Sequence, residues 1–210
     1  MSRLFYPILI AAHCMMCILV SSCSKNEEEP GEYDNWQARN QAYVDSIANL
    51  AKQGIDGWKR TLIFYYQQEY ADANPGENNI YVYTKKLADG TGTVSPLYSD
   101  SVRVFYRGRF IPSKSYREGY VFGQSFTEPD LNSINESTAV PTLLSVSGNV
   151  PGFCQALQEM VEGDAIRMVV PYLLGYGAPS TNSAIPDYSA LIFDVKLVKL
   201  YKHGESVTWR

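Results

Sequence analysis

Apolar and polar residues alternate in short runs along most of the chain after residue 79. Gly, Pro, Asn or Ser bound these runs, which cover 80–87, 101–110, 119–126 and 142–148. A last run places an apolar side chain at every second position, at Leu191, Phe193, Val195 and Leu197. This period of two predicts β-strands, each with one consistently apolar face.

Residues 34–53 instead follow the spacing of a helix. Their apolar side chains recur at intervals of seven, four and three, at Trp36, Tyr43, Ile47 and Leu50. Gly54 then ends the pattern, so we expect an amphipathic helix. The next stretch, 58–70, mixes β-branched and aromatic residues, and its pattern does not decide between helix and strand.

A shorter helical pattern interrupts the strands at 149–163. Its apolar side chains fall on one face, at Phe153, Leu157, Met160 and Val161. Gly163 stands where a C-cap glycine belongs. Five or six strands with one short helix predict an α+β half-barrel, in which an antiparallel sheet wraps around that helix.

The first residues have the pattern of a targeting segment. Arg3 precedes the apolar stretch 6–20, which is shorter than the ~20 residues a spanning helix needs. The stretch runs into LVSSC at 19–23, which resembles the lipobox of bacterial lipoproteins and implies removal of residues 1–22 and lipidation of Cys23. The alternative is a stop-transfer helix with an incidental cysteine. Residues 24–33 are polar and charged, so 23–33 is predicted to be the lipidated Cys and a flexible acidic tether.

Composition excludes several functions. The chain is 45% hydrophobic, enough for a core, and its net charge of −4 without a basic tract gives no signal for nucleic acid. After loss of the signal segment, His203 is the remaining histidine and Cys154 the remaining internal cysteine. A metal site or a nucleophilic triad needs more such groups, so neither a metal nor a cofactor is expected.

Several motifs in a fixed order make residues 80–200 resemble the FKBP-type peptidyl-prolyl cis-trans isomerases. They are VFYRG at 104–108, FGQS at 122–125, NVPGF at 149–153, the stretch 171–177 that ends in Tyr-Gly, and the stretch 185–197 that begins with Ile-Pro. The resemblance divides the chain into the signal and tether, an N-terminal extension at 34–77 and an FKBP-like domain at 78–202.

The resemblance implies an aromatic cup that takes a proline ring. Phe153 would form its floor, and its walls would be Tyr106, Phe122, Val150, Ile185 and Phe193. The hydroxyl of Tyr176 would donate a hydrogen bond to a substrate carbonyl, and the backbone N–H of Val150 would be a further donor. The loop 178–186 would be a flap over the cup, with Ala184 and Ile185 nearest the substrate. Counting along the chain adds Val140 as another wall. In this family an Asp usually stands where this chain has Gly123, and an insertion occupies 127–139.

Three functions therefore stay open at this level. The first is an isomerase, anchored through Cys23 in the bacterial cell envelope, that acts on X-Pro bonds of envelope or surface proteins. The second is a weakly active or inactive chaperone module that binds prolyl peptides, which Gly123 favours. The third is a scaffold whose tyrosine-rich N-terminal region mediates contacts, including a homodimer through the N-terminal helix. The sequence favours the enzyme, and leaves open the membrane leaflet that holds the anchor.

Overall fold

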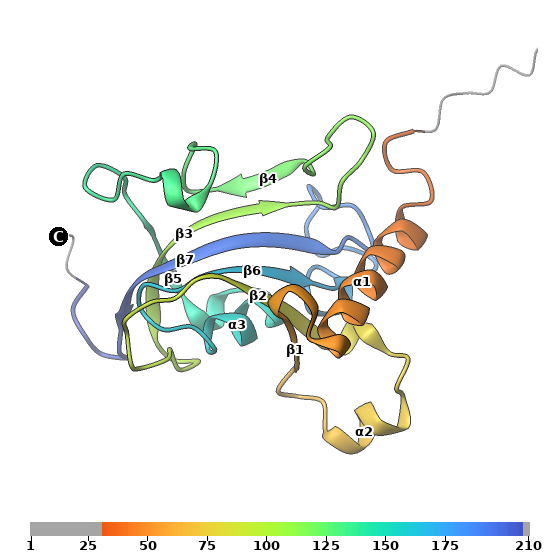
Figure 1. Ribbon diagram of the computed structural model, residues 1–210, viewed down its shortest axis with the longest axis horizontal. Helices are drawn as coiled ribbons and strands as arrows, with labels where there is room; N and C mark the ends of the chain where they lie inside the picture. Colours follow the sequence, from red (N-terminus) through yellow and green to blue (C-terminus); the bar gives the residue numbers. More distant parts are fainter. Residues whose placement is uncertain (1–30, 208–210) are drawn as a thin grey trace, which may run out of the picture. The chain divides into compact units, whose positions relative to one another are not determined.

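A twisted antiparallel sheet of seven strands organises residues 31–207, the part of the chain that the computed structural model describes (Figure 1). The strands are β1 (Trp58–Leu62), β2 (Tyr81–Ala88), β3 (Ser101–Arg109), β4 (Val121–Gln124), β5 (Thr142–Ser145), β6 (Ala165–Val170) and β7 (Leu191–Tyr201). Their order across the sheet is β1-β2-β6-β7-β3-β4, and β5 also pairs with β3. The predicted signal segment at 1–22 and Cys23 lie outside the described residues.

The free edge of β3 is shared by two short strands. β5 pairs with its first half, from Ser101 to Val104, and β4 pairs with its second half, from Arg107 onward. Between the two, the backbone N–H of Tyr106 donates to Ser125 Oγ, and the N–H of Ser125 donates back to the carbonyl of Tyr106. This change of partner fixes Tyr106 at the point where the sheet edge opens.

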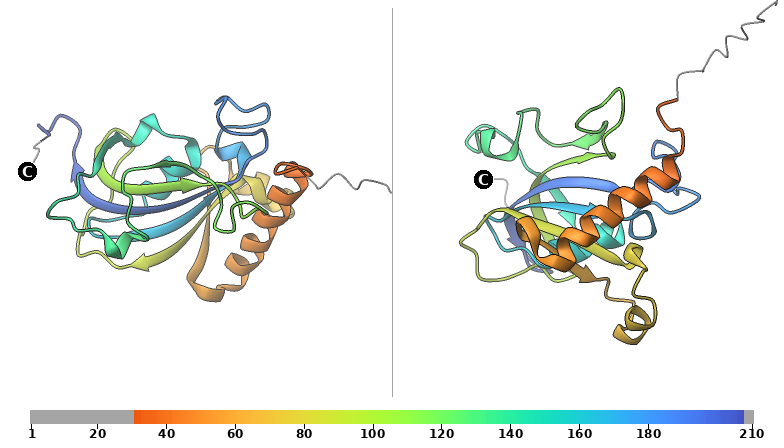
Figure 2. Two further views of the ribbon diagram at one scale, coloured as in Figure 1. Left: turned by 90° about the horizontal axis from the view of Figure 1, so that it is seen from above. Right: turned by 45° about the vertical axis from the view of Figure 1, so that its right-hand side comes forward.

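Two helices cover opposite faces of the sheet, α1 (Trp36–Gln53) on the outer face and α3 (Pro151–Leu157) on the inner face (Figures 1 and 2). Val82, Tyr83 and Thr84 on β2 are consecutive and all buried, as a strand covered on both sides requires. The helix predicted at 34–53 is therefore confirmed. Its buried positions are Trp36, Asn40, Val44, Ile47 and Ala48, with Tyr43 and Leu50 partly buried beside them.

The N-terminal extension is part of the same compact unit as the sheet. The stretch whose state the pattern leaves undecided forms β1, which pairs with β2 from Trp58 opposite Lys85 to Leu62 opposite Tyr81. The short helix α2 (Gln68–Ala73) follows it. Trp58 is 6% exposed and belongs to the main core, so β1 adds packing as well as an extra strand.

The insertion at 127–139 packs on the outer face of the sheet. Leu131 and Ile134 join Phe126 in a small apolar cluster over Phe105 and Ala165. Successive side chains of a strand point to opposite faces, so Phe105 and Tyr106 face opposite ways. The insertion therefore lies on the side of the sheet that Tyr106 does not face.

One detail of the sequence-based prediction was wrong, the end of the second helix. Helix α3 ends at Leu157, and Gly163, with φ of 91°, lies in the turn before β6. Its N–H donates to the carbonyl of Leu197 at 2.8 Å, and a Cβ there would come within 2.9 Å of Gly90 Cα. Gly163 is thus needed for a close backbone approach and is not a helix cap.

The predicted apolar face of the last strand is confirmed, since Leu191, Phe193, Val195 and Leu197 are all buried, but the register of β7 shifts just after Leu197. Arg103 pairs with Lys199 but Val104 pairs with Leu197, so Val198 bulges out of the ladder. The bulge shifts the alternation by one residue. Leu197 and Leu200 are consequently both buried while Lys199 is exposed.

Between residues 31 and 207, no helix combines the length and the apolar composition that crossing a bilayer requires.

Candidate active site

A hollow of about 560 Å³ opens beside the N-terminus of α3. Its lining comes from β3, β4, β7, the start of α3 and the loop that follows β6. Six of the nine residues that sequence reasoning assigned to the peptide site line it, namely Tyr106, Phe122, Val150, Phe153, Tyr176 and Phe193. Segments more than 80 residues apart in the sequence thus meet in one place.

Three phenylalanine rings form the base of this pocket. Phe153 and Phe193 meet edge to face, with ring centroids 4.9 Å apart and planes at 80°. Phe122 meets Phe193 in the same way at 5.6 Å and 88°. Edge-to-face contacts between aromatic rings add to the stabilisation that burial alone gives. Phe110 stacks behind Phe122 at 5.2 Å, so the pocket wall is supported by the core.

Gly108 explains why the rings come so close to β3. A Cβ at this position would lie 2.6 Å from Phe193 Cε1 and 2.7 Å from Phe122 Cζ. Both distances are shorter than any normal contact, so a larger residue would displace the rings. The glycine of the VFYRG motif is therefore required by packing.

The start of α3 brings backbone donors to the pocket. Val150 has an extended backbone, with φ of −61° and ψ of 148°, and Pro151 at the first helical position has no N–H to leave unpaired. The carbonyl of Val150 accepts the N–H groups of Phe153 and Cys154, each at 3.0 Å. Among the described residues, the N–H of Val150 donates to no acceptor.

Tyr176 reaches the opposite wall from a tight turn after β6. The N–H of Gly177 donates to the carbonyl of Tyr172 at 2.9 Å, with φ of 84° at Gly177. This left-handed conformation favours glycine. The carbonyl of Tyr176 accepts the N–H of Thr181 at 2.8 Å, which connects the turn to the loop that follows. The Tyr-Gly sequence therefore serves to hold the tyrosine at the pocket.

The remaining predicted residues lie elsewhere. Ile185 is 4% exposed and belongs to the main core, and its neighbour Ala184 is exposed on the flap. Val140 is 74% exposed and borders a separate shallow hollow with Phe126 and Thr127. The insertion before Val140 has moved this position away, so counting along the chain did not locate it.

Gly123 leaves one side of the pocket open. A Cβ at Gly123 would lie 3.7 Å from Tyr106 Cε2 and 3.8 Å from its hydroxyl oxygen, both ordinary contact distances. The space for a side chain beside Tyr106 is therefore present, and the residue that would fill it is missing.

Two asparagines that sequence reasoning missed also line the pocket, Asn149 and Asn182. The Asn149 amide donates to the carbonyl of Ser145 at 2.7 Å, and the Asn182 side chain accepts the N–H of Ala184 at 3.0 Å. Both hold loops in place. Asn149 could have been noticed because it directly precedes the residue at the start of the helix.

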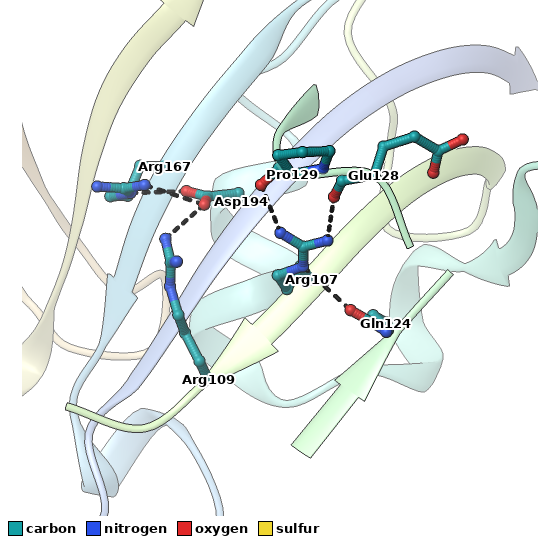
Figure 3. A network of polar contacts seen from close by, with 7 residues as sticks. All are labelled: Arg107, Arg109, Gln124, Glu128, Pro129, Arg167 and Asp194. Atoms are coloured by element: carbon teal, nitrogen blue, oxygen red, sulfur yellow. Dashed lines mark hydrogen bonds and ion pairs between the residues drawn. The ribbon is translucent and has the colours of Figure 1, made fainter. Parts of the chain in front are cut away.

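The opposite face of the sheet under the pocket carries a cluster of charges (Figure 3). Asp194 follows Phe193 on β7 and points to the outer face. There it accepts hydrogen bonds from Arg109 at 2.5 Å and from Arg167 at 2.6 and 3.0 Å. The bonds to Asp194 raise the pKa of the Arg167 guanidinium above its ordinary value. The cluster ties β3, β6 and β7 together directly behind the aromatic rings.

Cys154, the neighbour of Phe153 on α3, has a packing role. Burial raises the pKa of the Cys154 thiol, which donates to the carbonyl of Val146 at 2.9 Å, so this cysteine is a packed side chain. No group of three or more His, Cys, Asp or Glu residues within 31–207 has the arrangement of a metal site. The pocket offers aromatic surface, two tyrosine hydroxyls and a backbone N–H.

Known proteins resemble this chain in both sequence and fold. The sequence profile of the FKBP-type peptidyl-prolyl cis-trans isomerases matches residues 92–198. The macrophage infectivity potentiator of Trypanosoma cruzi is 33% identical over 198 residues, which are 94% of this chain and 86% of that protein. The outer membrane protein MIP of Legionella longbeachae is 31% identical over 117 residues, 56% of this chain and 43% of that protein.

A solved structure agrees with the architecture. The crystal structure of a peptidyl-prolyl cis-trans isomerase from Pseudomonas syringae superposes with a TM-score of 0.53 at 20% identity. The match covers 83% of this chain and 99% of that one. It confirms the predicted α+β half-barrel.

The profile match and the relatives define an enzyme of the peptidyl-prolyl cis-trans isomerase class, built on an α+β half-barrel. The chain belongs to the family of FKBP-type peptidyl-prolyl cis-trans isomerases, as its profile match and its relative in Trypanosoma cruzi show.

Proposed function

We propose that the aromatic pocket is the catalytic site and that it holds the proline ring of the substrate against Phe153. Phe122, Phe193, Tyr106 and Val150 enclose the ring, and Tyr176 donates its hydroxyl to a neighbouring substrate carbonyl. Ile185 and Ala184 belong to the flap that covers the bound peptide. The observation that carries this assignment is the convergence of three phenylalanine rings and two tyrosines on one hollow.

The chemistry follows from the peptide bond itself. Partial double-bond character gives rotation about X-Pro a barrier of roughly 18–20 kcal/mol. A twisted amide has lost that resonance and needs less solvation by water than the planar amide. An apolar pocket therefore stabilises the twisted amide relative to the planar ground state. The Val150 N–H and the Tyr176 hydroxyl hold the peptide on either side of the bond. A 10⁵-fold acceleration would require about 7 kcal/mol of such differential binding.

A weakly active peptide-binding module is the second candidate, and Gly123 is the observation that favours it. Without a carboxylate beside Tyr106, the pocket retains its apolar surface but has one polar group fewer to order its rim. Peptide binding depends mainly on the apolar surface, so it would persist even where turnover is low.

The clients are proline-containing polypeptides of the cell envelope, reached from a lipid anchor at Cys23. The lipobox-like sequence supports the anchor, and the outer membrane relative supports the location. Radiolabelled palmitate should enter the full chain and be lost in Cys23→Ala. A homodimer through α1 would have to use its polar side, because the apolar side packs on the sheet.

Isomerisation of an Ala-Xaa-Pro-Phe reporter peptide tests the assignment. We expect residues 24–210, which include the whole compact unit, to accelerate the reaction. Tyr176→Phe should lower kcat/KM about fivefold, the equivalent of one hydrogen bond of about 1 kcal/mol. Tyr172→Phe is the matched control, because Tyr172 lies in the same turn but does not line the pocket.

No acceleration by the parent protein, together with measurable binding of a prolyl peptide, would support the binding module. Equal losses in Tyr176→Phe and Tyr172→Phe would show that the turn, and not the hydroxyl, matters.

A further inference from the structure

A second uncharged hollow lies against the same helix that opens the prolyl pocket. Its lining is Phe64, Tyr98, Gln155 and Gln158, and its volume is about 470 Å³. We call it the aromatic hollow. Phe64 is 61% exposed and Tyr98 is 52% exposed, although both side chains carry large apolar rings.

The rings of the aromatic hollow are held in place by their neighbours. Phe64 contacts Tyr65 at 5.1 Å and Tyr98 at 6.2 Å, both nearly edge to face. Phe64 follows β1, whereas Tyr98 precedes β3, so the contact joins two connections far apart in sequence. The segment that carries α2 projects from the sheet beyond β1 (Figure 1). Phe64 and Tyr98 are in contact, so their exposed apolar surface is contiguous, and contiguous apolar surface is a feature of interaction sites.

Helix α3 links the aromatic hollow to the prolyl pocket. Pro151 lines the pocket, and Gln155 and Gln158 line the hollow. These three positions are separated by four and three residues, so they follow one face of the helix. At 1.5 Å per residue, Pro151 and Gln158 lie about 10 Å apart along the axis, which an extended chain spans in about three residues.

The chemistry of the hollow fits an unfolded polypeptide. None of its four lining residues carries a charge, and the rings provide flat apolar surface. Gln158 donates from Nε2 to the carbonyl of Cys154 at 3.2 Å, and its amide oxygen can accept a hydrogen bond from a peptide backbone. A segment that leaves the prolyl pocket along α3 would meet this surface. A second copy of the chain is a less suitable occupant, because its binding in the aromatic hollow would have no connection with the prolyl pocket.

We propose that the aromatic hollow is a second binding site for the same client, which holds apolar side chains about three residues away from the proline being isomerised. This inference rests on the proposed function. Short peptides would not reach the hollow, whereas unfolded proteins would, so the site would favour protein clients over small ones.

The test compares two substrates. The first is the tetrapeptide reporter, and the second is an unfolded protein whose refolding is limited by prolyl isomerisation. The variant is Phe64→Ser with Tyr98→Ser, and the control is Leu87→Ser with Val94→Ser, two exposed apolar residues outside both sites. Near-UV circular dichroism checks that each variant keeps its fold.

We expect the variant to keep tetrapeptide activity within about twofold and to lose roughly fivefold or more in kcat/KM on the protein, about 1 kcal/mol. The control should change neither. If the variant keeps the parent's kcat/KM on both substrates, the inference is overturned. Equal losses on both substrates would also overturn it, because the rings would then act only through the prolyl pocket. Sedimentation that shows the parent protein to be a dimer and the variant to be a monomer would also overturn the inference. The aromatic hollow would then be a site of self-association.

A binding measurement separates this inference from the proposed catalysis. A labelled, permanently unfolded polypeptide without proline should bind the parent and bind the variant roughly fivefold more weakly by fluorescence anisotropy. If the parent protein does not accelerate isomerisation of the tetrapeptide, the proposed function is wrong. The binding measurement would still show whether the aromatic hollow binds polypeptide. Unchanged binding in the variant would overturn the hollow alone.

Discussion

Phe153 on α3 and Phe193 on β7 meet edge to face, with ring centroids 4.9 Å apart. This contact joins the central helix to the middle of the sheet at the base of the pocket. Because Phe122 meets the same ring from β4, any change in the position of Phe193 alters two walls at once. The pocket therefore depends on residues that support Phe193 without lining the hollow.

Gly108→Ala should disturb both stability and activity. The new methyl group would overlap Phe193 and Phe122 and push the rings into the pocket. We expect a loss of about 1–3 kcal/mol in the free energy of unfolding, which chemical denaturation measures. Reporter-peptide kcat/KM should fall as well. Gly76→Ala is the control, since nothing lies within 4 Å of its Cβ; a similar effect at both sites would contradict the packing argument.

Gly123→Asp should raise activity. The Cβ fits at 3.7 Å from Tyr106, and a carboxylate there would meet the tyrosine hydroxyl at the pocket rim. A hydrogen bond to a charged group is worth about 1.5–3 kcal/mol, and even partial use of it in the transition state gives a gain of about three- to tenfold in kcat/KM. Gly123→Asn has nearly the same shape without the charge. Equal gains in both would attribute the effect to filling the space.

Asp194→Asn should destabilise the sheet. The Asp194 side chain is 13% exposed and lies between Arg109 and Arg167, so its neutralisation leaves two guanidinium groups without their counterion. We expect a loss of about 2–4 kcal/mol in the free energy of unfolding. Asp56→Asn removes an exposed pair with Lys85 and should cost less than about 1 kcal/mol. Similar values for the two variants would refute the role of the buried pair.

Acid should destabilise the protein through Asp164. Burial alone would raise the pKa of this carboxyl, but bonds from Lys86 and from the N–H groups of Gly90 and Val161 outweigh it and hold the pKa below its ordinary value. A lowered pKa in the folded state means that the stabilisation is complete above the unfolded pKa of about 4. It is lost as the pH falls through the folded pKa.

Denaturation curves between pH 7 and pH 2 measure this contribution. Asp164→Asn should be less stable by about 1–3 kcal/mol at pH 7 and should lose less on acidification than the parent. Asp89→Asn is the control, because Asp89 pairs with the same lysine but its side chain is 87% exposed. Parallel pH profiles for the parent and Asp164→Asn would rule out this residue as the source.

Most of the fold was predictable because its signals are local. Strand alternation, the helical spacing of 34–53 and the order of the motifs each depend on a few neighbouring residues, and together they predicted the half-barrel. The state of 58–70 was not predictable. Whether Trp58 to Leu62 forms a strand depends on the free edge of β2, whose paired residues lie 19 to 27 positions further along the chain.

The site was predictable where the spacing to a motif is fixed. Tyr106, Phe122, Phe153 and Phe193 follow their motifs without gaps, and they meet in the pocket. Val140 follows an insertion, so its spacing carried no information and it lies elsewhere. The bulge at Val198 could not be located either, because Lys199 ends the alternating pattern without showing where the ladder shifts, and only the register with β3 shows it.

The first helix also closes the far end of the flap. Trp36 Nε1 donates to Ser189 Oγ at 2.9 Å, and the Asn40 side chain accepts the N–H of Ala190 at 2.8 Å. These two bonds fasten the segment that joins the flap to β7. The family profile begins only at residue 92, yet the segment at 189–190, which follows the proposed flap, is fastened by residues 36 and 40. The smallest fragment able to turn over a substrate should therefore begin before Trp36, well upstream of the residues that the family profile matches.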